Sequence, residues 1–127
     1  MQFDKLNARK ALFWIGSSKK GLVAMPSAIR RDFGFALDYA QQGLRPEGAK
    51  LLKGKVAGAT QLSEDHQGDT YRAVYTVELE ECIYVLHCFQ KKSKKGAETP
   101  KPDLDLIGAR LKAAKSLHAE RKRKNDD

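Results

Sequence analysis

The stretch that decides the fold is Tyr71–Lys95, with the sequence YRAVYTVELEECIYVLHCFQKKSKK. It contains two runs rich in β-branched and aromatic residues, Tyr71–Val77 and Cys82–Phe89, and these residue types favour strands. The acidic segment Glu78–Glu81 separates the two runs, and this pattern predicts an antiparallel hairpin. Four lysines follow the second run, so the end of a rigid strand is expected to carry a cluster of positive charge.

The register of this hairpin decides which side chains share a face, because alternate residues of a strand point to opposite sides. A turn centred on Leu79-Glu80 places Tyr75 opposite Tyr84 and Arg72 opposite His87. One face is then apolar enough to lie against a core: Tyr71, Ala73, Tyr75, Val77, Cys82, Tyr84, Leu86 and Cys88. The other face is expected to bring Arg72 together with an imidazole, an aromatic ring, a lysine and two apolar residues, namely His87, Phe89, Lys91, Ile83 and Val85. A slip of one residue would bury polar groups and is disfavoured.

The beginning of the chain predicts a strand and a short helix. Arg9–Ile15 is an apolar run suited to an edge strand or a second central strand. Ser17 or Ser18 can cap a helix that extends to about Met25, although Gly21 weakens this helix.

A longer helix is expected next, with Pro26 in its first turn and Gly43 as its glycine stop. Its apolar side chains recur at helical spacing: Ile29, Phe33, Leu37 and Ala40. Leu44–Lys55 is a turn-rich basic connection, Val56–Leu62 a weak strand, and Ser63–Asp69 an exposed loop.

After the hairpin, Lys91–Pro102 holds five lysines and is expected to be an exposed loop. Asp103 can cap a last helix, whose apolar stripe is Leu104, Ile107, Leu111 and Ala114. The charged end, residues 120–127, is expected to fray, which gives one domain over residues 1–118 and a basic, disordered tail over 119–127.

The expected order of elements, β-α-α-β-β-β-α, is typical of an α+β fold. It predicts a twisted, mainly antiparallel sheet with two N-terminal helices and a C-terminal helix. We expect the two early helices to cover one face of the sheet and the face of Arg72 to be left partly open.

Charge and hydropathy limit the classes of function. The chain has 127 residues, enough for one domain, and its 24 Lys and Arg against 16 Asp and Glu give a net charge of +8. This excess favours a polyanionic partner, either nucleic acid or an acidic protein. No apolar run approaches the length of a membrane span, and the first residues lack the apolar core of a signal peptide, so we expect a cytoplasmic protein without membrane contact.

The cysteines and histidines predict neither a disulfide nor a metal site. Cys82 and Cys88 lie on one predicted strand, about 20 Å apart at the rise of a strand, whereas a disulfide needs Cα atoms within about 7 Å. They are expected to be reduced core residues. His66, His87 and His118 show no ligand spacing, so we predict no metal and no cofactor.

Six pieces of the sequence, in order and at natural spacing, resemble one family of proteins. They are LDYAQQG (37–43), KLLKG (50–54), DTYRAVYTV (69–77), YVLHCFQKKSKKG (84–96), TP (99–100) and DLDLI (103–107). Together they resemble the RelE/HigB superfamily of toxins from type II toxin–antitoxin modules, in particular its phage-derived killer-protein branch. The resemblance extends from about Trp14 to Ala114.

This resemblance implies a RelE-like fold and a small, metal-independent RNA endonuclease, an mRNA interferase. Such a toxin cleaves mRNA, usually on the translating ribosome, and so inhibits translation. It also implies a cognate antitoxin that often carries a helix-turn-helix. By position, the arginine of the family's strand falls on Arg72, and the basic end of its last strand falls on Phe89, Lys91 and Lys92. One departure is that Thr60-Gln61-Leu62 stands where the branch commonly has Trp-Glu-Leu, so a glutamate is not available there.

Cleavage by attack of a 2′-OH on its own phosphate needs a base, cations for the charge of the phosphorane, and a donor for the leaving oxygen. Arg72 is the best charge stabiliser, because its planar fork can hold two phosphate oxygens. The alternative is a surface partner for Glu78 or Glu64. Lys91 or Lys92 could act as base or acid, since crowding of like charges makes a neutral amine more accessible. A patch that only holds RNA is the alternative.

The remaining candidates are expected to bind RNA. Phe89 could stack on a base or form an edge of the core. His87 could transfer a proton, although a histidine in so apolar a strand is more often structural. The lysines expected to contact phosphates are Lys53, Lys55, Lys94 and Lys95.

Three functions remain open at this point. The first is an mRNA endonuclease, with Arg72, Lys91 and Lys92 as catalytic residues. The second is a noncatalytic RNA- or ribosome-binding module with the same fold. The third is a basic face that serves to dock an acidic antitoxin, which is compatible with the first.

Overall fold

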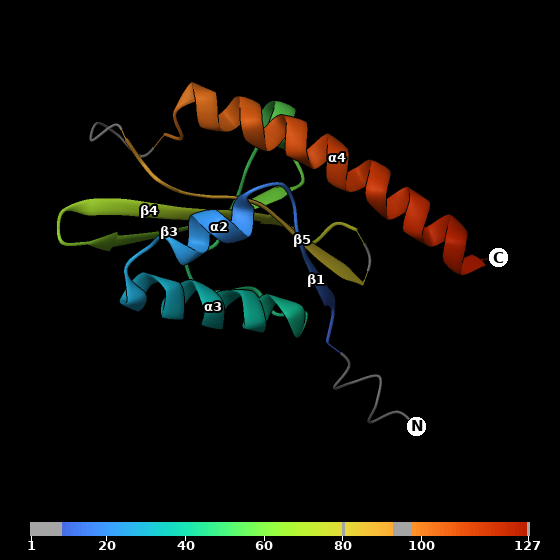
Figure 1. The fold of residues 1–127 in the computed structure, drawn as a ribbon, viewed down its shortest axis with the longest axis horizontal. Coiled ribbons are helices and arrows are strands. Elements are labelled where there is room, and N and C mark those ends of the chain that lie inside the picture. Colours follow the sequence, from blue (N-terminus) through green and yellow to red (C-terminus); the bar gives the residue numbers. More distant parts are fainter. Residues whose placement is uncertain (1–8, 80, 93–97, 127) are drawn as a thin grey trace.

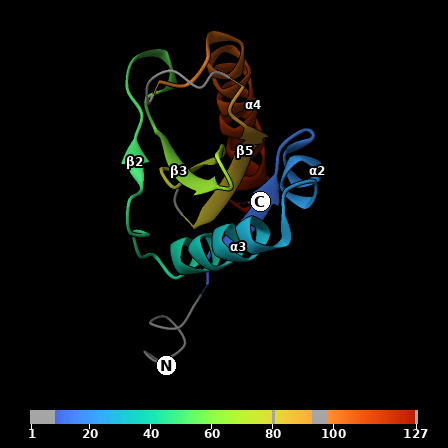
Figure 2. The same cartoon turned by 90° about the vertical axis from the view of Figure 1, so that its left-hand side faces the viewer.

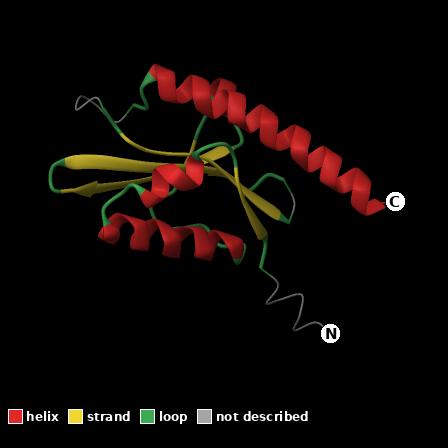
Figure 3. Ribbon diagram, in the orientation of Figure 1, coloured by secondary structure: helices red, strands yellow, loops and turns green. Residues whose placement is uncertain are grey.

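The computed structural model describes residues 9–79, 81–92 and 98–126. Its elements are β1 (Ala11–Trp14), α2 (Ser18–Val23), α3 (Ser27–Gln41), β2 (Lys50–Leu51), the 3-10 turn η1 (Gly54–Val56), β3 (Ala59–His66), β4 (Asp69–Thr76), β5 (Cys82–Gln90) and α4 (Lys101–Asp126). Within the described residues, five strands form one sheet in the order β1-β5-β4-β3-β2 (Figures 1 and 3). β1 pairs with β5 in parallel, and the other pairs are antiparallel. The predicted α+β class is confirmed.

Helices cover both faces of this sheet. In Figure 2 the sheet lies between α4 and α3, with α2 beside it. The core cluster on the α3 side contains Ile29, Phe33, Leu37, Tyr71, Ala73, Tyr75, Ile83, Val85 and Cys88. The cluster under α4 contains Val74, Tyr84, Leu86, Phe89, Ile107, Leu111 and Ala114. The prediction that the face of Arg72 is partly open is therefore wrong, because α4 packs on it.

The hairpin forms, but its register differs from the predicted one. Arg72 lies opposite Phe89, two residues away from the expected partner His87, which pairs with Val74. The register then shifts at a β-bulge between Val74 and Tyr75, and Tyr75 lies opposite Val85. Leu86 is the extra residue of β5. The bulge reverses the alternation of β5, so Tyr84 and Leu86 face α4 while Ile83 and Val85 face α3, the opposite of the prediction.

An arginine of the last helix holds this bulge in place. Arg110 on α4 donates from Nη1 to the carbonyl oxygen of Leu86 at 2.8 Å. Its Nη2 donates to the hydroxyl of Ser17 at 2.9 Å, so Ser17 precedes α2 without a side-chain capping bond. Arg110 thereby ties α4 to both the bulge and the start of α2.

The short helix α2 lies directly on β5 through Gly21. A Cβ added at Gly21 would stand 2.2 Å from the carbonyl oxygen of Cys88. Gly21 is therefore required by a close approach of helix and strand, and is more than a weak point of the helix. Cys88 and Cys82 are both free thiols, as predicted, and burial raises the pKa of Cys88 to about 12.

The longer helix α3 follows its sequence pattern closely. Pro26 occupies the position before its first residue, and its four predicted apolar residues are buried. Gly43 has a φ of +83° just after the helix, a conformation that suits glycine.

Other boundaries differ from the prediction. The expected loop Ser63–Asp69 is the end of β3 and the start of β4, with a tight turn at Gln67-Gly68. The basic connection Leu44–Lys55 contains β2 and the start of η1. α4 begins at Lys101, so Asp103 lies in its first turn, and it continues through Asp126 where the charged end was expected to fray. The single domain over residues 1–118 stays a prediction.

Candidate nucleic-acid interface

Arg72 lies in the interior of the sheet, opposite Ser63 on β3 and Phe89 on β5. Only 4% of it is exposed, and burial lowers the pKa of its guanidinium, against the carboxylates of Asp65 and Asp103. Its Nη1 donates to the hydroxyl of Thr99 at 3.0 Å. Arg72 is thus held beneath the segment that leads into α4, and its burial does not fit the alternative of a surface residue.

The hydroxyl of Thr99 extends this contact from β4 to β3. It accepts from Arg72 and donates to the Oε1 of Gln61 on β3 at 2.7 Å. Gln61 is buried on the face of β3 that lies toward α4, opposite Val74. Sequence reasoning treated Gln61 as a lost glutamate and missed it as part of the site. A polar residue at a strand position that alternation buries is the signal that could have found it.

His87 is held by the first turn of α4. Its Nε2 lies 2.8 Å from the Oδ1 of Asp103, and its ring stacks on Phe89 with centroids 4.4 Å apart. Burial lowers the pKa of His87, and this effect outweighs the hydrogen bond to Asp103, which raises it. A neutral imidazole must carry its proton on Nε2 to donate to the carboxylate, so His87 has a structural partner.

We expect acid to destabilise the protein through His87. An unfolded histidine has a pKa near 6.5, and the folded protein has a lower one, so below about pH 6.5 the unfolded chain binds a proton that the folded chain does not. The free energy of unfolding should therefore fall as the pH drops through that value. His87→Asn should flatten this dependence in urea titrations at pH 7.5 and 5.5. The same slope in both proteins would contradict the assignment.

Phe89 lies in the core rather than on an open surface. Only 9% of the residue is exposed, and it packs in the cluster under α4. A base could stack on it only after the covering residues move, so the structure favours the alternative in which Phe89 is an edge of the core that orients His87.

The two described lysines that follow β5, Lys91 and Lys92, differ in burial. Lys91 is buried, and its backbone N–H donates to the carbonyl of Thr70 at 2.8 Å, which extends the pairing one residue beyond β5. Strand alternation then places Lys91 on the face of Phe89 and Arg72. Lys92 is exposed. Lys94 and Lys95 lie outside the described residues.

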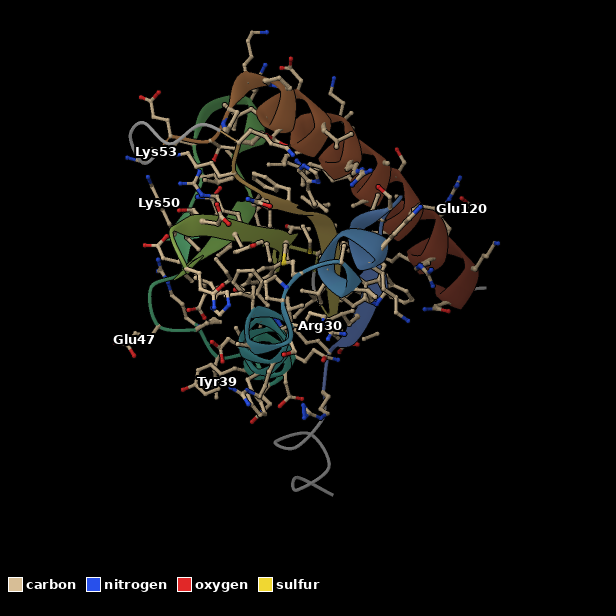
Figure 4. All side chains as sticks on the ribbon, turned by 60° about the vertical axis from the view of Figure 1, so that its left-hand side comes forward. Arg30, Tyr39, Glu47, Lys50, Lys53 and Glu120 are labelled. Carbon is tan, nitrogen blue, oxygen red and sulfur yellow. The ribbon has the colours of Figure 1, made fainter. Side chains whose placement is uncertain are left out.

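The two lysines of the basic connection differ in their contacts. Lys53 precedes η1 and is exposed. Figure 4 shows it on the same side of the molecule as Lys50, far from Glu120 on the distal part of α4. Lys55 forms an ion pair with Asp105 of α4, with Nζ and Oδ1 2.6 Å apart. The hydrogen bond from Lys55 lowers the pKa of Asp105, with a further contribution from Lys101.

The described residues contain neither a metal-binding cluster nor a membrane-spanning helix. No group of three or more His, Cys, Asp or Glu side chains among them is placed to hold a metal ion. In the same residues no helix has the length and hydropathy to cross a membrane.

The sequence model of the phage-derived Gp49-like proteins (DUF891) matches residues 20–112, which is most of the chain. The chain belongs to the Gp49-like family. In this Gp49-like protein the matched region takes in Arg72, Gln61, His87, Thr99 and Asp103. No curated protein sequence matches the chain significantly.

The fold of this Gp49-like protein is that of RelE. A double arginine-to-alanine mutant of the E. coli toxin RelE, solved in the free state, superposes with a TM-score of 0.52. The match covers 66% of this chain and 85% of the RelE chain at 18% identity. The expected RelE-like fold is confirmed by this likeness, and the phage-derived branch that the sequence resemblance indicated agrees with the Gp49-like family model.

Proposed function

We propose that this protein is the toxin of a type II toxin–antitoxin module and that it cleaves mRNA on the translating ribosome without a metal ion. The Gp49-like family and the RelE fold suggest a toxin with an antitoxin partner. The net charge of +8 suits a partner made of RNA. The partner that neutralises the toxin is expected to carry a helix-turn-helix.

The observation that carries this proposal is the position of Arg72. A guanidinium fixed by Thr99 lies on one face of the sheet with His87 and, by alternation, Lys91. In the proposed reaction the 2′-oxygen attacks the adjacent phosphorus, the bond to the 5′-oxygen breaks, and a 2′,3′-cyclic phosphate and a 5′-hydroxyl result. Arg72 stabilises the charge that develops on the phosphorane oxygens. Lys91 or Lys92 takes the 2′ proton or supplies one to the leaving oxygen.

The experiment that tests this function is to incubate the purified protein with translating ribosomes and to map the 5′ ends of the mRNA. New ends within the codon at the A site support the endonuclease, and the same incubation with free mRNA shows whether the ribosome is needed. Intact mRNA together with tight ribosome binding supports the second candidate, a noncatalytic module. The burial of Arg72 is the observation that favours that candidate.

Lys91→Arg separates proton transfer from electrostatic support. Arginine keeps the charge but cannot act as a base near neutral pH. If Lys91 moves a proton, single-turnover cleavage at saturating protein should fall by about 10²-fold or more, with nearly unchanged ribosome binding. Lys92→Arg, at the exposed neighbouring position, is the matched control and should cut normally. If Lys92→Arg does not cleave mRNA while Lys91→Arg cleaves normally, Lys92 rather than Lys91 is the lysine that transfers a proton.

A further inference from the structure

One short segment contacts three of the site residues. Within residues 99–105, three described side chains each contact a candidate site residue: Thr99 accepts from Arg72 at 3.0 Å, Asp103 binds His87 at 2.8 Å, and Asp105 binds Lys55 at 2.6 Å. Asp105 also pairs with Lys101 within the segment, at 3.3 Å. The three partners come from β4, β5 and η1, so the segment bridges groups that are distant in sequence.

The three partners share one chemical property. Arg72, His87 and Lys55 are N–H donors for which an RNA phosphate is the expected ligand. The hydroxyl of Thr99 and the carboxylates of Asp103 and Asp105 offer oxygen acceptors in place of phosphate oxygens. With these contacts made, Arg72 is 4% exposed and cannot meet an RNA strand directly.

The segment is held differently from the rest of α4. Its contacts to the site are polar, and the pair of Lys55 and Asp105 is largely exposed, with 61% and 48% of the two side chains accessible. Exposed ion pairs of this kind contribute little to stability. Full apolar burial of α4 begins at Ile107, which is 0% exposed, and continues at Leu111 and Ala114. Within the first turn only the half-buried Leu104 packs against the core cluster, so the turn can leave the site at the cost of that one apolar contact while Ile107, Leu111 and Ala114 stay packed.

We infer that the segment from Thr99 to Asp105 occupies the positions of the RNA phosphates in the free protein and is displaced when RNA binds. The segment is an internal competitor that covers Arg72, and RNA must exchange with it to reach the site. This inference rests on the proposed function, because it takes RNA as the ligand of the same residues.

Removing the competing carboxylates should strengthen RNA binding. The double variant Asp103→Asn/Asp105→Asn should bind a single-stranded RNA carrying 2′-O-methyl groups, which cannot be cut, about three to ten times more tightly. Asp105→Asn alone should show part of this gain in RNA affinity. Because Asp105 is exposed, this single variant still tests the inference if the double variant does not fold. Both are compared in thermal unfolding as well as in binding.

A matched control separates this effect from a change in net charge. Glu120→Gln removes one carboxylate from the exposed distal part of α4, where Glu120 pairs with Lys124 (Figure 4). Asp105→Asn should tighten RNA binding more than Glu120→Gln. Equal affinities, or weaker binding by Asp105→Asn, would overturn the inference.

Hydrogen exchange gives a second readout. Saturating RNA should speed exchange of the Leu104 amide, which donates to the carbonyl oxygen of Pro100 at 3.0 Å, and should leave residues 107–114 unchanged. Slower exchange of the Leu104 amide would also overturn the inference. If the wild type cuts mRNA but the variants gain no affinity for RNA, the proposed function stands and only the role of the segment Thr99–Asp105 as an internal competitor is excluded. If neither wild type nor variants bind RNA or ribosomes, the proposed function fails together with it.

Discussion

Arg72→Ala is expected to abolish growth arrest and to lower mRNA cleavage by about 10²-fold to 10³-fold, the cost of removing one preorganised donor to a developing oxyanion. The guanidinium can hold two phosphate oxygens in one plane, and alanine offers neither donor nor charge. Arg72→Lys keeps the charge but loses the planar fork, so its rate should lie between those of the alanine variant and the wild type. Single-turnover cleavage on translating ribosomes gives the three rates.

The control for this prediction is a second arginine that has no place in the site. Arg31 is exposed on α3, and Arg31→Ala should cleave mRNA at the rate of the wild type. Because Arg72 is buried, unfolding curves of all variants must accompany the rates. Growth arrest by Arg72→Ala equal to that of the wild type, at matched soluble expression, would contradict the catalytic role.

Gly21→Ala should destabilise the protein by about 1–3 kcal/mol or more, although alanine normally favours a helix over glycine by about 1 kcal/mol. The added methyl would stand 2.2 Å from the carbonyl oxygen of Cys88. A backbone atom of a central strand cannot move aside as a flexible side chain can. α2 must therefore shift off β5, and the free energy of unfolding, measured by denaturant titration, must fall.

Replacing glycine by alanine elsewhere should raise the free energy of unfolding instead of lowering it. A Cβ added at Gly34, in the middle of α3, meets no described atom within 4 Å. Gly34→Ala should therefore stabilise the protein by up to about 1 kcal/mol through helix propensity. If Gly21→Ala is as stable as Gly34→Ala, the close approach of α2 to β5 is wrong.

The helices and the hairpin could be predicted from the sequence because local patterns specify them. α3 has apolar residues at helical spacing between Pro26 and Gly43, and nothing distant is needed to recognise it. The register of the hairpin could not be predicted. Residues 83–86 are buried on both faces of the sheet, so alternation of apolar and polar residues carries no information there, and a bulge reverses the faces.

The shared strand face of Arg72, His87 and Phe89 was nevertheless predicted correctly. Near Arg72 the register differs from the expected one by two residues, an even number, so His87 and Phe89 still share its face. The contacts that cover Arg72 could not be predicted, because Thr99, Gln61 and Asp103 meet only through the tertiary fold. Of the two roles left open for Phe89, the structure favours the edge of the core, since Phe89 packs in the cluster under α4.

The place of β5 in the sheet has a consequence for biosynthesis. β5 lies between β1 and β4, so β1 leaves the ribosome early and has no strand to pair with until the second arm of the hairpin has followed it. Pairing between such distant segments forms late, because the intervening chain must first be closed into a loop. Thr99 and the first turn of α4 are synthesised later still. The protein therefore assembles the surroundings of Arg72 only after β5 and the first turn of α4 have been synthesised.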